Sequence, residues 1–81
     1  MIKLFRRRRY TVQAFHPSDY GPFGHMKFHH AYQVSDYMTF IRRSYPHTEF
    51  LVRDRETGKV GHDYPAKNGN PGTHWTARIG R

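Results

Sequence analysis

Residues 31–46, AYQVSDYMTFIRRSYP, decide the fold of this chain because they repeat apolar residues with the period of an amphipathic helix. The apolar positions are spaced by three and four residues: Ala31, Val34, Met38, Ile41 and Tyr45. Ser35 followed by Asp36 could also start a helix inside this stretch. Pro46 ends the pattern, because the residue before a proline avoids the helical region. We therefore predict one helix that packs its apolar stripe on a sheet.

Strand patterns lie on both sides of the predicted helix. Residues 10–15, YTVQAF, alternate in the manner of a half-buried strand, and residues 49–53 alternate again. Residues 54–59, DRETGK, predict a turn in which Gly58 takes a positive φ, so that residues 59–64 return as a partner strand. The expected fold is α+β, with three strands and one helix on one face. If the first two strands pair in parallel, their connection is a right-handed crossover.

Two segments lack such patterns. Residues 16–30 contain two prolines and two glycines, and they predict a long loop between the first strand and the helix. Residues 65–81 are rich in Asn, Gly and Pro, and they predict an extended tail with Trp75 as its apolar anchor. The expected organisation is a compact domain over residues 1–64, with a tail over 65–81 that docks through Trp75 on the domain or on a partner.

The composition limits the protein class. The chain has 81 residues and no cysteine, so it forms one small domain without disulfides or thiolate metal sites. No apolar run approaches the roughly 18 residues that span a bilayer, and the N-terminus lacks the apolar stretch of a secretory signal. We expect a cytoplasmic protein, inside the cell that makes it, with no membrane partner.

The charge is strongly positive, with 14 Lys and Arg against 6 Asp and Glu and a formal net charge of +8. Such an excess favours polyanionic partners. Four of the cations are consecutive, Arg6–Arg9, directly before the first strand pattern. A charged edge that prevents aggregation is one interpretation of this run. Phosphate binding is the other, because guanidinium groups present a planar fork to phosphate oxygens.

Aromatic residues interleave with the cations, a mixture that can stack bases while the cations follow phosphates. Most aromatic residues in so small a domain belong to its core, so the expected contacts concentrate on a few positions. The candidate residues for binding nucleic acid or an acidic partner are Arg6, Arg7, Arg8, Arg9, Arg42, Arg43, Tyr20, Phe23 and Trp75.

The histidines do not predict a metal site or a catalytic site. His25 and His29 are four residues apart, but nothing in the sequence supplies the further ligands of a zinc ion. Residues 61–75 faintly resemble the His–Asn–His order of a ββα-metal nuclease, through His62, Asn68 or Asn70, and His74. The glycines and proline between them oppose the helix that this motif needs. We predict no enzyme, no metal and no cofactor.

The leading functional prediction is a small basic accessory protein that binds nucleic acid or a nucleoprotein assembly through an arginine-rich arm and aromatic contacts. The alternative is a protein–protein inhibitor, an adaptor or a virion-type assembly subunit, encoded by a virus or a mobile element. In that case the arginines would face an acidic partner surface. Oligomers are possible in both cases.

Overall fold

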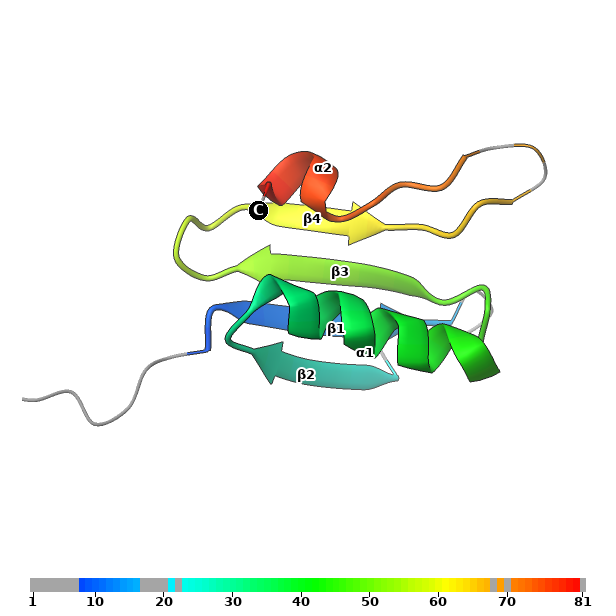
Figure 1. The fold of residues 1–81 in the computed structure, drawn as a ribbon, viewed down its shortest axis with the longest axis horizontal. Helices are drawn as coiled ribbons and strands as arrows, with labels where there is room; N and C mark the ends of the chain where they lie inside the picture. The colour runs from blue at the N-terminus through cyan, green and yellow to red at the C-terminus, as the bar shows by residue number, and fades with distance from the viewer. Residues whose placement is uncertain (1–7, 17–20, 22, 68, 70, 81) are drawn as a thin grey trace, which may run out of the picture.

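The computed structural model describes residues 8–16, 21, 23–67, 69 and 71–80. Its elements, in chain order, are β1 (Tyr10–Phe15), β2 (Gly24–Phe28), α1 (Ala31–Ser44), β3 (Glu49–Asp54), β4 (Val60–Asp63) and α2 (Thr76–Ile79). The four strands form one sheet in the order β2-β1-β3-β4, and every neighbouring pair is antiparallel. Helix α1 packs across one face of this sheet (Figure 1). The small α+β fold with one main helix is therefore confirmed.

The predicted three-stranded sheet is wrong by one strand. Residues 24–28 form β2, inside the segment that we expected to be a loop, and they pair with β1 from Tyr10↔Phe28 to Ala14↔Gly24. The middle of this strand, His25 to Lys27, is exposed and has little apolar pattern. An edge strand of this kind is held by its ladder with β1 rather than by burial, so alternation in the sequence does not reveal it.

The parallel pairing that we considered for the first and second predicted strands is also wrong. β1 and β3 are antiparallel, with Val12 opposite Val52 and Ala14 opposite Phe50. Strand β2 reverses the chain before α1 begins, so α1 connects two strands that are not neighbours, β2 and β3. Since both are antiparallel to β1, β2 and β3 run in the same direction, and the β2–α1–β3 connection is a parallel crossover that passes over β1.

The helix begins at Ala31, and the internal start at Ser35 is not used. Gln33 Oε1 accepts hydrogen bonds from the backbone N–H groups of His29 and His30 at 3.1 and 3.0 Å. These bonds give partners to donors at the helix N-terminus, which lack intrahelical acceptors. The helix ends at Ser44, two residues before Pro46, as the sequence predicts.

The predicted hairpin is confirmed as β3 and β4, with Phe50 opposite Asp63 and Arg53 opposite Val60. Gly58 has a φ of +79° in the turn, a conformation that costs little for glycine because it lacks a Cβ. The turn is further held by the N–H of Gly58, which donates to Asp54 O at 2.8 Å.

The core lies between the sheet and the two helices. It contains nine buried hydrophobic residues: Tyr10, Val12, Ala14, Val34, Met38, Phe50, Val52, Trp75 and Ile79. Trp75 and Ile79 come from the C-terminal segment, where the short helix α2 stands in place of a fully extended tail. Trp75 is fully buried and meets the ring of Tyr10 edge-on at 5.5 Å. The C-terminal segment thus completes a core that the remaining elements leave thin.

Close packing explains why Gly61 stands in β4. A Cβ at this position would lie 2.4 Å from the backbone oxygen of Trp75 and 3.3 Å from side-chain atoms of Ile79. Any larger residue would push α2 away from the sheet, so the docking of the C-terminal segment depends on this glycine. Neither helix in the described part of the chain is long and apolar enough to cross a lipid bilayer.

Candidate functional site

The face of the sheet opposite the helices carries polar side chains. Successive residues of a strand point to opposite faces. Because Tyr10, Val12 and Ala14 of β1 are in the core, Thr11 and Gln13 point to the other face. We call this second surface the open face, since both described helices pack on the core side.

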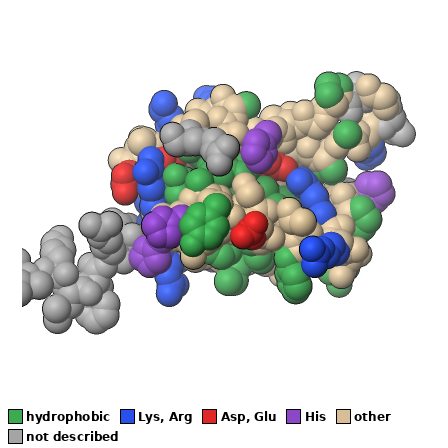
Figure 2. Space-filling view, in the orientation of Figure 1, with side chains coloured by type: hydrophobic (Ala, Val, Ile, Leu, Met, Phe, Trp, Pro, Cys, Tyr) green, Lys and Arg blue, Asp and Glu red, His purple; other side chains and the backbone are tan. Residues whose placement is uncertain are grey.

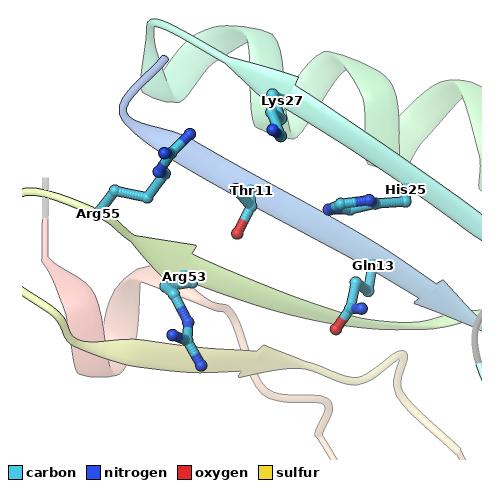
Figure 3. A pocket seen from close by; sticks show the side chains of 6 residues that line it. All are labelled: Thr11, Gln13, His25, Lys27, Arg53 and Arg55. Carbon is cyan, nitrogen blue, oxygen red and sulfur yellow. The ribbon is translucent and has the colours of Figure 1, made fainter. Parts of the chain in front are cut away.

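A shallow hollow of about 350 Å³ lies on the open face. Its lining comes from β1, β2, β3 and the residue after β3: Thr11, Gln13, His25, Lys27, Arg53 and Arg55. Figure 3 shows these six side chains on one side of the strands. The register explains the grouping, because Lys27 and Arg53 lie on either side of Thr11 in neighbouring strands.

The hollow is positively charged. Three of its six lining residues are cations, Lys27, Arg53 and Arg55, and none of the six is acidic. Lys27 and Arg53 are exposed to solvent. Since none of the described lining residues carries a carboxylate, the cations there are available to a ligand, and their summed potential favours an anion.

The arginine run joins the sheet at the same end as this hollow. The backbone N–H of Arg55 donates to Arg9 O at 2.7 Å, and Arg55 Nη1 lies 3.5 Å from Arg8 O. Arg8 is exposed, while Arg6 and Arg7 lie outside the described residues. The chain that enters β1 therefore brings further positive charge to this end of the sheet.

The structure places Arg9, a predicted binding residue, in an internal ion pair. Its guanidinium donates to Asp54 through Nε at 3.0 Å and Nη2 at 2.9 Å, and it lies 3.5 Å from Glu56. Asp54 is fully buried, and these hydrogen bonds lower the pKa of its carboxyl and raise the pKa of Arg9. A bidentate pair of this kind supports the fold and leaves Arg9 little capacity for a ligand.

Arg42 is also held internally. It donates to Thr48 O through Nε and Nη2 at 3.1 and 2.9 Å, and to Asp63 Oδ1 through Nη1 at 2.7 Å. Its guanidinium also lies over the ring of Phe50, 4.9 Å from the centroid. Arg43, the next residue, is exposed on α1 and therefore stands away from the open face.

The three predicted aromatic residues have different positions. Trp75 is in the core, so it reaches no partner in this structure. Phe23 is 42% exposed and packs against Tyr45, with ring centroids 5.6 Å apart. Tyr20 lies outside the described residues. The structure brings neither Phe23 nor Trp75 into the hollow.

The residues of the hollow were not among the predicted site residues. Two strands do carry a signal, because their cations alternate with positions on the core side: Arg53 follows the buried Val52, and Lys27 precedes the half-buried Phe28. Grouping them requires the strand order, and β2 itself was not predicted. The hollow therefore emerges only from the three-dimensional register.

The histidines form no metal cluster in the described part of the chain, where no three potential ligands lie together. His62 stacks on Tyr64, with ring planes within 6° of parallel. His74 Nδ1 lies 2.9 Å from Asp63 Oδ2, and His74 precedes α2 rather than standing on it.

Comparisons with known protein families, curated proteins and solved structures find no match to this chain.

Proposed function

We propose that this protein binds nucleic acid by its phosphate backbone, with the open face of the sheet as the contact surface. The observation that carries the proposal is the hollow, in which Lys27, Arg53 and Arg55 face outward without a carboxylate among the lining residues. Guanidinium and ammonium groups hold phosphate oxygens by charge-assisted hydrogen bonds. Arg8, exposed just before β1, adds a further cation beside Arg55.

The composition of the hollow favours contact with the backbone over base stacking. Its described lining residues include no Phe, Tyr or Trp, whereas stacking platforms for single strands are built from aromatic side chains. Thr11 lies between Lys27 and Arg53, and Thr11 and Gln13 offer hydroxyl and amide groups that can bind phosphate or sugar oxygens. We therefore propose binding with little sequence preference, inside the cell, where nucleic acid is abundant.

An acidic protein surface is the competing ligand for the same cations. The extent of the positive charge favours nucleic acid, because the exposed Arg8 lies next to the cations of the hollow, and a long polyanion can occupy both. A compact acidic patch would match only part of this surface. The two partners differ in how they release counterions, which gives the test.

The test is the salt dependence of binding to fluorescent DNA and RNA, single-stranded and duplex, of one length and mixed sequence. For duplex DNA, each phosphate contact contributes about −0.9 to the slope of log K against log salt concentration. We expect steep slopes that flatten by about 2.7 when Lys27, Arg53 and Arg55 are all replaced by Gln. Lys59→Gln in the hairpin turn is the control, since it removes one exposed cation that is not among the described lining residues of the hollow.

Two results would reject the proposal. One is the absence of binding to all four nucleic acids at low salt. The other is binding whose slope is the same in the triple Gln variant as in the unchanged protein, since the ligand would then contact another surface.

A further inference from the structure

Exposed hydrophobic residues gather beside β2, away from the open face. The described chain has six large hydrophobic residues that are strongly exposed: Phe23, Met26, Tyr32, Phe40, Tyr45 and Tyr64. Four of these six lie in or next to β2 or toward the C-terminal end of α1: Phe23, Met26, Phe40 and Tyr45. Figure 2, which views the helix-covered side, shows hydrophobic side chains along the margin where β2 and α1 lie in Figure 1.

The helix contacts place Phe40 on the flank of α1 that faces β2. Tyr37 packs against Phe28 of β2, with ring centroids 5.4 Å apart, whereas Arg42 reaches Asp63 of β4. Residues three apart on a helix lie on the same side, so Phe40 follows Tyr37 on the β2 flank. Phe40 is 67% exposed there, and Met26 of β2 is 44% exposed.

β2 is also an edge of the sheet. Its one described neighbour is β1, so in the described part of the chain the other side of its backbone has no strand partner. An unpaired edge offers backbone N–H and C=O groups to an extended segment. The exposed apolar flank and the unpaired edge thus lie together. This grouping differs from the hydrophobic residues that are scattered singly over most protein surfaces.

The two sides of β2 define the segment that fits. Gly24 approaches Tyr37 of α1, and Phe28 packs on the same residue, so these alternate positions, with Met26 between them, face the helix. His25 and Lys27 face the hollow. A strand added to β2 would place alternate side chains beside Met26 and Phe40, and the others beside Lys27. The side chains of the added strand that lie beside Met26 and Phe40 should therefore be apolar, and those that lie beside Lys27 should be acidic.

We propose that the β2 edge binds an extended segment of a partner protein in which apolar and acidic residues alternate. The net charge of +8 is complementary to such a segment and opposes a second copy of this chain. A twofold pairing of β2 about Met26 would place Lys27 opposite His25 of the other copy. A lysine on an edge strand discourages pairing with like chains, while it attracts an acidic strand.

The probe is a labelled, end-capped peptide of seven residues that alternates valine and glutamate, titrated by fluorescence anisotropy at about 0.15 M salt, where distant charges are screened. The comparison peptide replaces every glutamate by lysine. We expect binding of the valine–glutamate peptide and at least tenfold weaker binding of the valine–lysine peptide. Amide NMR signals of residues 24–28 should shift on binding.

Phe40→Ser tests the apolar side, and Tyr32→Ser is its matched control, because Tyr32 is 62% exposed on the same helix. We expect Phe40→Ser to weaken peptide binding about tenfold or more and Tyr32→Ser to leave it unchanged. Equal binding of both peptides, equal effects of both variants, or shifts that avoid residues 24–28 would overturn the proposal. So would a peptide-free dimer, in sedimentation, that Phe40→Ser dissociates. Nucleic-acid binding is expected to survive Phe40→Ser, which separates this proposal from the function of the open face.

Discussion

The two faces of the sheet use their arginines in different ways. Toward the core face, Arg9 and Arg42 each meet a buried carboxylate, Asp54 and Asp63, at 2.9 and 2.7 Å. Both carboxylates are less than 5% exposed. A buried carboxylate without its cation is costly, so these arginines are needed by the fold.

On the open face, the cations have no such partner among the residues that the structure describes. Lys27, Arg53 and Arg55 share a hollow whose other lining residues are Thr11, Gln13 and His25. The comparison shows that charge alone does not make an arginine available to a ligand. An arginine is occupied where the fold places a carboxylate beside it, and the strand register determines where that happens.

The largest predicted effect concerns the C-terminal part of the core. Trp75→Ala should reduce the free energy of unfolding by about 3–5 kcal/mol, because it removes a fully buried ring that packs on Tyr10. Urea denaturation followed by circular dichroism measures this loss. Trp75→Phe should cost clearly less, since it keeps a ring and removes the indole N–H, which has no described hydrogen-bond partner. A loss below about 1 kcal/mol for Trp75→Ala would show that the C-terminal segment is not part of the core.

The next effect concerns Asp63, which accepts hydrogen bonds from Arg42, His74 and the backbone N–H of Trp75. Asp63→Ala should destabilise the protein by about 3 kcal/mol, because the partly buried Arg42 loses its carboxylate and the buried N–H of Trp75 loses its acceptor. Asp36→Ala, at an exposed position on α1, is the control and should change the free energy of unfolding by about 0.5 kcal/mol or less. Equal effects of the two variants would contradict the structural role of Arg42.

The pH dependence tests the Arg9–Asp54 pair. Hydrogen bonds from Arg9 lower the pKa of Asp54 below its ordinary value of 3.8. Above this value the carboxyl is charged in both the folded and unfolded states, and the stabilisation is complete. As the pH falls below 3.8 toward the folded pKa, the unfolded state takes up the proton first, so stability is lost.

Asp54→Asn should therefore flatten the decrease in stability below about pH 4, measured by urea denaturation between pH 5 and pH 2. Asp36→Asn should keep the decrease seen in the unchanged protein. A decrease that Asp54→Asn leaves unaltered would show that this pair does not contribute to stability.

The smallest effect on stability is expected on the open face. Lys27→Gln and Arg53→Gln should each change the free energy of unfolding by no more than about 0.5 kcal/mol, because both residues are exposed. Each should still flatten the salt dependence of duplex DNA binding by about 0.9. A variant that unfolds the protein, or one that leaves the salt slope unchanged, would remove the distinction between the two faces.

The sequence predicts the parts of this fold that depend on local patterns. Periodicity places α1, alternation places β1 and β3, and Gly58 marks the turn of the hairpin. β2 is not predictable in the same way, because its exposed middle residues lack apolar alternation and its pairing with β1 is a long-range property. The short helix α2 is missed for a related reason, since four residues carry too little periodicity.

The same limit applies to the candidate site. The sequence draws attention to the consecutive arginines, but the buried carboxylates that bind Arg9 and Arg42 are 45 and 21 residues away. Conversely, Lys27, Arg53 and Arg55 come from separate segments and form one hollow only through the register of three strands. Pairing across the sheet, rather than local composition, decides which cations remain available.

Amide NMR spectra of the protein, recorded while a short duplex DNA of mixed sequence is added, test the central claim most directly. The predicted result is a set of shifts at Thr11, Gln13, His25, Lys27 and Arg53, with small changes at Val34 and Met38 in α1. Shifts concentrated on α1, or an unchanged spectrum at low salt, would contradict the claim that the open face binds nucleic acid.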